Sequence, residues 1–369
     1  MRPFALERYF ARYEFDTRYL LCASDPETLS LEELLAHDSG SVQRLALLRL
    51  GYIESRGTGA LRAAIAALYE RCGAESVLAH SGAEEAIFVF MNTALQRGDH
   101  AIVQFPAYQS HYSVAERIGV DVTRWHSDLT GEGSPNVDEL ERLVRPETRV
   151  IVLTTPNNPT GYAFDRAQME RIVGIAREHE LWLLGDEVYR GTEREAERIP
   201  AVCDWYERGV SLGGLSKAYG LAGLRIGWSC TRDRALAQRM AALKDYLSIC
   251  NSAPGEFLAE LALRHHAALA DRVRVITTRN LDLLDDFFAR RSHLFGWTRP
   301  RAGTTAFPRY LGGSSEAFCA RVVAGAGVLL LPSTLFDAGD GHIRFGYGRA
   351  DLPEALATLD RFIDSERAS

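Results

Sequence analysis

The chain has 369 residues, of which 46% are hydrophobic and 25% are charged, and its formal net charge is −7 without a basic block. This composition is typical of a globular protein with two domains, and it argues against nucleic acid as a partner. The sequence shows neither a secretory signal nor an apolar run of membrane-spanning length, so we expect no export and no membrane anchoring.

The cysteines are scattered along the chain and form no Cys-x-x-Cys pair. This spacing indicates neither a zinc site nor a disulfide framework, so we expect no bound metal. Unpaired cysteines fit a reducing compartment, and the cytoplasm is therefore the expected location. The six positions are Cys22, Cys72, Cys203, Cys230, Cys250 and Cys319.

Between residues 57 and 265, short β-rich runs alternate with longer amphipathic segments. This alternation predicts an α/β domain of three layers around a mainly parallel sheet. One predicted helix, residues 60–72, has an apolar stripe at helical spacing that we interpret as core, formed by Leu61, Ile65, Leu68 and Cys72. The candidate strands are residues 100–105, 149–155, 181–184, 209–212 and 224–230.

The C-terminal part of the chain predicts a smaller α/β domain. A long helical stretch near residues 255–292 precedes candidate strands at 297–311, 326–332 and 342–347. A closing helix has Pro353 near its first turn and one apolar face, formed by Leu352, Leu356, Leu359 and Ile363. We therefore expect an N-terminal segment (1–56) that packs with the small domain, a large domain (57–265) and a small domain (266–369).

Lys217 lies in the stretch LSKAYGLAGLRIGW (215–228), an apolar run punctuated by glycines that also contains Arg225. A lysine that condenses with an aldehyde must be neutral, and burial in apolar surroundings lowers its pKa. Arginine keeps its charge in such surroundings and holds phosphate with a planar fork of donors. The alternative interpretation of Lys217 is an ordinary surface lysine.

Several polar residues fall where a candidate strand ends and a loop begins, which is where ligands bind in open α/β sheets. Asp186 follows the apolar run LWLLG, although a helix N-cap is an alternative role. Asn158 lies in NNPTG directly after RVIVLTT, although these residue types also form simple turns. In HSGAEEAIF, a small-residue turn opens a predicted helix whose free N–H groups favour an anion, with an ordinary cap as the alternative.

Five segments occur in the order found in one known family, and the chain resembles the class I and II aminotransferases. These are enzymes of fold type I that use pyridoxal 5'-phosphate, and the resemblance implies that fold, that cofactor, and an amino acid and a 2-oxo acid as substrates. The matching segments are HSGAEEAIF (80–88), FPAYQSHY (105–112), TTPNNPTGY (154–162), GDEVY (185–189) and LSKAYGLAGLRIGW (215–228).

The resemblance implies a role for each matching residue. Lys217 would form the Schiff base with the cofactor, the internal aldimine, and Asp186 would pair with the pyridine nitrogen so that the ring accepts electrons. Tyr189 and Asn158 would bind the 3'-oxygen of the cofactor, with Asn158 also beside the substrate. Tyr108 would stack on the pyridine ring, unless it is simply a core or surface tyrosine. The cofactor phosphate would lie near Gly82, Ala83, Glu84, Ser216 and Arg225.

Two more residues are assigned by the resemblance, one to the substrate and one to a dimer. Arg344, in GHIRFGYGR, matches the arginine that binds the substrate α-carboxylate through a bidentate pair, with Arg349 as the alternative. Strand alternation places Arg344 on the opposite side from Ile343 and Phe345. Tyr52 resembles a tyrosine that reaches a phosphate across the subunit interface. We therefore expect a homodimer with shared active sites, with residues 1–56 at its interface.

Two positions depart from the family pattern. Gly214, three residues before Lys217, stands where many relatives have a Ser or Thr that binds the phosphate, so we expect Ser216 or a water molecule to replace that hydroxyl. The segment PRAGTTAFPRY (300–310) stands where relatives often have a glycine pair ahead of aromatic residues. We expect this segment to shape the pocket for the substrate side chain.

The sequence thus predicts an aminotransferase in which Lys217 binds the cofactor and then acts as general base, moving the Cα proton of the substrate to C4' of the cofactor. A lyase, cyclase or hydroxylase of secondary metabolism that uses the same cofactor needs the same lysine, aspartate and arginine, and it is the alternative. A non-enzymatic binding module is a third interpretation. No attached DNA-binding domain is visible to favour it.

Overall fold

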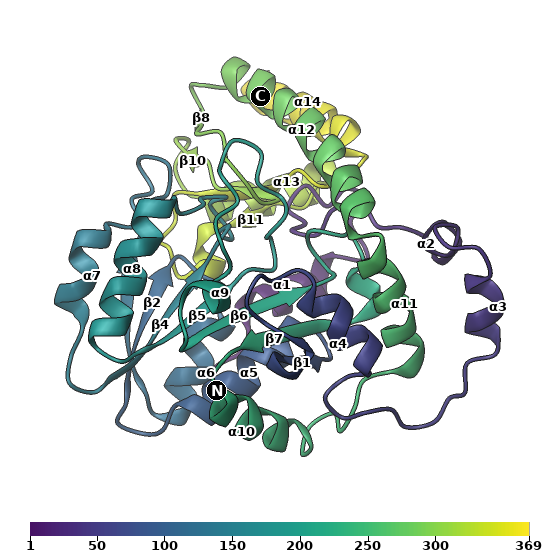
Figure 1. Cartoon of the computed structure of the whole chain (residues 1–369). Coiled ribbons are helices and arrows are strands. Elements are labelled where there is room, and N and C mark those ends of the chain that lie inside the picture. Colours follow the sequence, from purple (N-terminus) through teal and green to yellow (C-terminus); the bar gives the residue numbers. More distant parts are fainter. Residues whose placement is uncertain (369) are drawn as a thin grey trace.

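The computed structural model describes residues 1–368, and its main feature is a mixed sheet of seven strands (Figure 1). The strands are β1 (Val77–His80), β2 (His100–Phe105), β3 (Asp121–His126), β4 (Thr148–Thr154), β5 (Trp182–Asp186), β6 (Gly209–Gly214) and β7 (Gly227–Thr231). Their order in the sheet is β1-β7-β6-β5-β4-β2-β3. Only β7 is antiparallel to its neighbours, β1 and β6, so the sheet is mainly parallel, as predicted.

Helices cover both faces of this sheet and complete three layers. Successive strand residues point to opposite faces, so Val150 and Val152 of β4 join one apolar core while Ile151 joins another. The first core is closed by α5 (Ala83–Ala94), α6 (Ser110–Ile118) and α10 (Arg234–Lys244). The second is closed by α7 (Val137–Leu143), α8 (Arg166–Glu178) and α9 (Val202–Trp205). Burial on both faces explains the nearly continuous apolar runs of the central strands.

A third core lies at the β1 and β7 end of the sheet, against α4 (Gly59–Ala66) and α11 (Ala253–Arg264). It contains three buried cysteines, Cys72, Cys203 and Cys230, whose sulfur atoms lie within 4.8 Å of one another. The spacing of the cysteines in the sequence did not predict this cluster. Across residues 1–368, none of the helices combines the length and the apolar character that a membrane crossing requires.

The smaller C-terminal domain packs two small sheets against helices. Its helices are α12 (His266–Arg290), α13 (Ser315–Ala326) and α14 (Leu352–Ala368), drawn in green and yellow at the top of Figure 1. The predicted apolar face of the closing helix is confirmed, because Leu352, Leu356, Leu359 and Ile363 are all buried. Its strands are β8 (Phe295–Gly296), β9 (Thr305–Ala306), β10 (Arg309–Tyr310), β11 (Leu331–Pro332) and β12 (Ile343–Gly346).

The N-terminal segment contributes α1 (Ala5–Tyr13), α2 (Leu31–Leu35) and α3 (Ser41–Ala46). Part of it joins the small domain: Leu21 is buried in that domain's core, and its carbonyl accepts a hydrogen bond from the amide of Gly346 at 2.9 Å. Figure 1 shows α2 and α3 on an arm that extends away from the body of the molecule. The division of the chain at residues 57 and 266 stays a prediction.

Several predicted elements are corrected by the structure. The helix predicted at 60–72 ends at Ala66, because the chain then tightens into turns in which Leu68 and Tyr69 donate to Ile65 and Ala66. Its apolar stripe nevertheless faces the core. The helical stretch 255–292 is two helices, α11 and α12, that meet at His265.

Strand boundaries also differ from the prediction. The strand expected at 224–230 begins at Gly227, because residues 222–224 form a 3₁₀ turn and Arg225 has a left-handed backbone (φ 52°). The run 297–311 holds only the short β9 and β10, since Pro300, Gly303 and Pro308 interrupt it. Helix α13 occupies the start of the strand expected at 326–332. Three of the described strands were missed, namely the short β1, the polar edge strand β3 and the two-residue β8.

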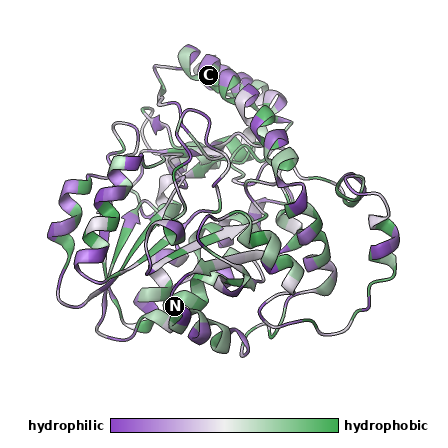
Figure 2. Ribbon diagram, in the orientation of Figure 1, coloured by the Kyte–Doolittle hydropathy of each residue, from purple (hydrophilic) through white to green (hydrophobic). Residues whose placement is uncertain are grey.

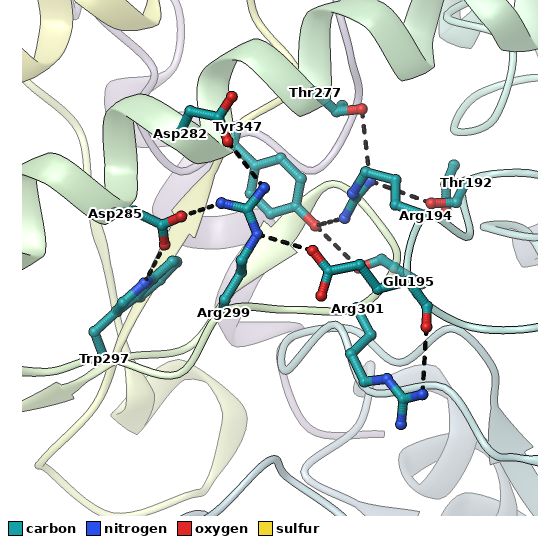
Figure 3. Close-up of polar contacts among 11 residues, drawn as sticks. Thr192, Arg194, Glu195, Thr277, Asp282, Asp285, Trp297, Arg299, Arg301 and Tyr347 are labelled. Atoms are coloured by element: carbon teal, nitrogen blue, oxygen red, sulfur yellow. Dashed lines mark hydrogen bonds and ion pairs between the residues drawn. The ribbon is translucent and has the colours of Figure 1, made fainter.

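The two domains are connected by arginine-centred contacts near Tyr347 (Figure 3). Arg194, in the loop after β5, donates to the Tyr347 hydroxyl at 2.7 Å and to the Gly303 carbonyl at 2.9 Å. In the same loop, the Thr192 hydroxyl donates to the Tyr189 carbonyl at 2.6 Å and accepts from the Gly303 amide at 2.9 Å. These contacts fix the backbone of Tyr189 against the small domain.

Candidate active site

A cavity of about 400 Å³ opens at the carboxyl ends of β4, β5 and β6, where the N-terminal segment and β12 close over the large sheet. Parallel strands leave a crevice at this edge, and the loops that follow them place polar side chains in it. Most of the predicted site residues line the cavity, namely Ala83, Glu84, Tyr108, Asn158, Asp186, Tyr189, Ser216, Lys217, Arg225 and Arg344.

Lys217 lies in the loop after β6, and its Nζ donates a hydrogen bond to the Ser24 hydroxyl at 2.8 Å. Burial lowers the pKa of this amine, opposed by the charges of Asp25 and Asp186. The chain contains one other lysine, Lys244, which is fully buried away from the cavity and pairs with Glu85 at 3.4 Å. Lys217 is therefore the lysine placed for chemistry in this cavity.

Asp186 is the last residue of β5, and only 5% of it is exposed. Its Oδ2 lies 3.0 Å from Nε2 of His111, a buried residue of α6. His111 was missed in the sequence, although it lies three residues after Tyr108 within the segment FPAYQSHY and so on the same side of a helical turn. A buried carboxylate with this neighbour can hold a negative charge next to a protonated ring nitrogen.

Asn158 and Arg344 meet inside the cavity. The Arg344 guanidinium has no exposed surface, donates from Nη1 to Oδ1 of Asn158 at 3.1 Å, and donates to the Cys22 carbonyl at 2.9 Å and 3.1 Å. With its Oδ1 accepting from Arg344, the amide of Asn158 presents its NH₂ group as a donor. Arg349 instead pairs with Asp25 at 2.6 Å and does not line the cavity, so the geometry favours Arg344 as the carboxylate ligand.

Two tyrosines frame the space in front of Lys217. Tyr189 is 2% exposed, its ring centroid lies 5.9 Å from the Lys217 Nζ, and its hydroxyl has no hydrogen-bond partner among the described residues. Burial raises the pKa of Tyr189, so the hydroxyl stays protonated and can donate. Tyr108, in the loop after β2, donates to Oε1 of Glu7 at 3.2 Å and presents its ring to the cavity.

The other end of the cavity is shaped for an anion. Helix α5 begins at Ala83 without a side-chain cap, so its first N–H groups point outward. A Cβ on Gly82 would lie 2.5 Å from the Arg225 guanidinium, and a Cβ on Gly227 would lie 2.4 Å from the Ala83 nitrogen. The two glycines therefore allow Arg225 and the helix start to converge. Ser216 lines the same region, and a Cβ on Gly214 would meet nothing closer than 3.6 Å.

These residues fit pyridoxal 5'-phosphate. The unpartnered hydroxyl of buried Tyr189 and the NH₂ group of Asn158 suit its 3'-oxygen, and Asp186 suits its ring nitrogen. Arg225, Ser216 and the start of α5 are donors suited to its phosphate. Glu84, in the first turn of α5, accepts a short hydrogen bond from Ser110, and burial raises its pKa, so it is not a natural phosphate ligand.

Some predicted residues lie elsewhere, and some cavity residues were not predicted. Tyr52 is 90% exposed and lies outside the cavity, beside Ser248 and Pro254. Sequence reasoning missed the N-terminal lining, which carries no family motif. It consists of Leu6, Glu7, Phe10, Glu14, Ala23, Ser24 and Asp25.

Comparisons with known proteins agree with this geometry. Residues 21–359 match the family model for aminotransferase class I and II. The chain is 27% identical to capreomycidine synthase of Streptomyces vinaceus, over 96% of this chain and 92% of that protein.

Two solved structures superpose on nearly the whole chain. A PLP-dependent aminotransferase from Streptococcus suis gives a TM-score of 0.93 at 30% identity, covering 99% of this chain and 98% of the other. The PLP-dependent cyclase OrfR gives a TM-score of 0.90 at 27% identity with the same coverage. The chain therefore belongs to the class I and II aminotransferase family and is a transferase that depends on pyridoxal phosphate.

Proposed function

We propose that the chain moves an amino group from an amino acid to a 2-oxo acid, with Lys217 as the residue that binds the cofactor covalently and then moves the substrate proton. The observation that carries this proposal is that Lys217, Asp186, Asn158 and Arg344 converge on one cavity from two loops and from the two strands β5 and β12. This constellation provides an amine, an acceptor for a ring N–H, and a guanidinium for a carboxylate.

The bound cofactor supplies an electron sink for the carbanion formed at the substrate Cα. Arg344 holds the substrate carboxylate, and Asn158 fixes the guanidinium through its Oδ1. Asp186, next to His111, keeps a negative charge at the ring nitrogen. Because burial lowers the pKa of Lys217, a larger fraction of its Nζ is neutral and able to accept the Cα proton near neutral pH.

Borohydride trapping followed by peptide mapping tests the assignment of Lys217. The chain offers only two lysines, so the outcome is binary. We expect the reduced cofactor on the peptide that contains Lys217. An adduct on Lys244, or none on a yellow protein, would contradict the assignment.

A cyclase or synthase reaction with the same cofactor is the second candidate. Capreomycidine synthase and the cyclase OrfR match almost the full length of the chain, and both reactions would begin with the same substrate deprotonation. Acceptor dependence distinguishes the two: an aminotransferase converts its donor to a 2-oxo acid only when an acceptor is supplied. A cyclised or eliminated product formed without an acceptor would favour the second candidate.

We further propose a homodimer in the cytoplasm with active sites shared between subunits. The arm that carries α2 and α3 exposes apolar side chains, including Leu47 (72%), Leu50 (83%) and Tyr52 (90%). Tyr246 and Ile249 are exposed on a nearby segment, which forms a hollow with Leu50 and Tyr52. Apolar surface of this kind is typical of an interface, and two-fold dimers are the most common assembly.

Subunit mixing tests the shared site. Chains with Tyr52→Phe and chains with Lys217→Ala are each expected to be impaired alone. In the mixed dimer, one site combines an intact Lys217 with an intact Tyr52 from the other subunit. We expect activity to return on mixing, and a mixture that stays as weak as its components would show that Tyr52 is not shared.

A further inference from the structure

Three carboxylates line the N-terminal side of the cavity, and the reaction has no role for them. Glu7 and Glu14 are seven residues apart on α1 and its C-cap, so they lie on one face of the helix with Phe10 between them. Asp25 follows Ser24, the residue that accepts the hydrogen bond from Lys217. Asp25 and Glu14 are near enough to the Lys217 amine for their charges to act on it, whereas Glu7 acts on Tyr108 and Glu84.

The cavity is a ligand site on grounds independent of these carboxylates. The hydroxyl of Tyr189, a residue that is 2% exposed, has no partner among the described residues, and Arg344 is fully buried while lining the same space. The occupant that fits Arg344 carries a carboxylate. With the carboxylate of the ligand at Arg344, the N-terminal side of the cavity faces the remainder of the ligand, which for an amino acid is its side chain.

Each basic side chain that lines the cavity has a partner under the proposed function. The basic side chains in its lining are Lys217, Arg225 and Arg344. Under the proposed function the first binds the cofactor covalently, the second faces the phosphate and the third faces the substrate carboxylate. The phosphate and the carboxylate both add negative charge. None of the three basic groups is left for Glu7 or Glu14, and the partner of Asp25 is Arg349, which does not line the cavity.

Of the three carboxylates, Glu14 is the one that lacks a partner among the described residues. Its half-buried carboxylate takes part in no hydrogen bond or ion pair among residues 1–368, whereas Asp25 has Arg349 at 2.6 Å and Glu7 has the Tyr108 hydroxyl at 3.2 Å. Burial raises the pKa of Glu14, and the charges of Asp25 and Glu7 raise it further, while the charges of Arg349 and Lys217 oppose this shift without offsetting it. A cation placed between these groups would remove that repulsion.

We propose that the substrate is an α-amino acid with a cationic side chain, a guanidinium or an ammonium group, held by Glu14 and Asp25 while Arg344 holds its α-carboxylate. This inference rests on the proposed function. A dicarboxylic amino acid would bring a further negative charge against Glu7 and Glu14, and a purely apolar side chain would bury Glu14 without a partner. Both arrangements are costly.

Arginine and citrulline are a matched pair of probes, because they have nearly the same shape and differ in side-chain charge. Binding to the holoenzyme can be followed by the change in its visible absorbance, and turnover by the 2-oxo acid formed. We expect arginine to bind on the order of 100-fold more tightly than citrulline, since charged hydrogen bonds are worth this much. A comparison of lysine with norleucine, which lacks the side-chain ammonium group, tests recognition of an ammonium group in the same way.

Two variants test the residues. Glu14→Gln keeps the shape and removes the charge, so the preference for arginine over citrulline should fall at least about tenfold. Asp16→Asn is the matched control, because Asp16 is an exposed carboxylate two residues away that does not line the cavity, and the preference should stay as in the wild type. Asp25→Asn gives a second reading if Glu14→Gln does not fold.

The possible outcomes separate this inference from the proposed function. Equal binding of arginine and citrulline, or an unchanged preference in both Glu14→Gln and Asp25→Asn, overturns the inference. Amino transfer from neutral or dicarboxylic amino acids alone also overturns it, while the aminotransferase activity stands. Tight, charge-dependent binding of arginine or lysine without amino transfer to any acceptor supports the inference and contradicts the proposed function.

Discussion

The cofactor side and the N-terminal side of the cavity differ in how their side chains are held. On the cofactor side, Arg344, Asp186 and Asn158 are 0%, 5% and 7% exposed and contact other buried groups. On the N-terminal side, Glu7 is exposed and Glu14 is half-buried on the C-cap of a helix of nine residues that buries one residue of its own, Leu6. Asp186 and Asn158 of the first side lie at or just after the ends of strands of the large sheet, and Arg344 lies on β12 of the small domain, whereas the second side belongs to the N-terminal segment. Figure 1 shows these elements.

This difference suggests that the residues of the cofactor side carry out the reaction and that those of the N-terminal side select the substrate. Side chains at the ends of buried strands cannot change without affecting the chemistry of every substrate, because each touches the cofactor or the α-amino acid core that all substrates share. Under the proposed substrate class, Glu14 at the C-cap of α1 would contact only the side chain that distinguishes one substrate from another. The hydropathy colouring shows apolar strands at the side of the sheet that carries β2 and β4, paler strands at β6 and β7, and helices of mixed character on the outside (Figure 2).

Replacing Lys217 should have the largest effect of any change on the cofactor side. We expect Lys217→Ala to lower kcat by about 10⁴-fold for every amino donor, because the general base is lost. Small amines added to the solution should restore part of the activity by replacing the missing Nζ. Steady-state rates with several donors give the measurement. A loss confined to one donor would show that Lys217 recognises substrate rather than moving protons.

Asp186→Asn should lower kcat by about 100-fold or more, since removing one partner of a buried charged pair costs about 3 kcal/mol or more. A cofactor methylated on its ring nitrogen carries a fixed positive charge and should rescue part of this loss. The same cofactor should do nothing for Lys217→Ala. Near-normal turnover of Asp186→Asn would mean that the carboxylate is not needed at the ring nitrogen.

Arg344→Lys should act mainly on binding. The lysine keeps the charge but loses the bidentate fork, so substrate binding should weaken by about 1.5 to 3 kcal/mol, or roughly 10- to 150-fold. The matched control is Arg349→Lys, which leaves the α-carboxylate contact in place. The dissociation constant of one amino donor, measured for both variants, shows which arginine binds the α-carboxylate. If Arg349→Lys weakens a neutral donor as much as Arg344→Lys does, the carboxylate ligand has been assigned to the wrong arginine.

The two sides also differ in how far the sequence predicts them. Asp186 and Asn158 could be placed because the first ends an apolar strand and the second lies in the loop after one, and the end of a parallel strand is a known position for ligand contacts. Gly82 and Arg225 could be placed because a glycine turn before a helix and an arginine both suit a phosphate.

The N-terminal side could not be predicted in this way. Helix α1 has an ordinary amphipathic pattern, and nothing in it shows that Glu14 would line one cavity with Asp25 and with Lys217, which is distant in the sequence. The pairing of His111 with Asp186 likewise arises only when α6 packs on the sheet. Strand β3 was missed for a local reason: as an edge strand it carries polar residues such as Asp121 and Arg124.

Gly214→Ser should have the smallest effect, and it sharpens the comparison because it acts on the cofactor side alone. Gly214 ends β6, its backbone is not left-handed, and a Cβ there would lie 3.6 Å from its nearest neighbour and 4.0 Å from the Ala83 Cβ, beside the start of α5. A serine hydroxyl can therefore reach the phosphate. One added hydrogen bond contributes about 0.5 to 1.5 kcal/mol, so the cofactor dissociation constant should fall by about 2- to 10-fold.

Gly213→Ser is the control for this change, because a Cβ on Gly213 would lie 2.4 Å from the Trp228 indole and should lower the melting temperature. Equilibrium dialysis of the cofactor and thermal unfolding give the two measurements. The ratio of arginine to citrulline binding should not change in Gly214→Ser, since the new hydroxyl lies at the phosphate end and Glu14 lies at the other. Weaker cofactor binding in Gly214→Ser would place the phosphate away from α5, and the division of the cavity into two sides would then have to be redrawn.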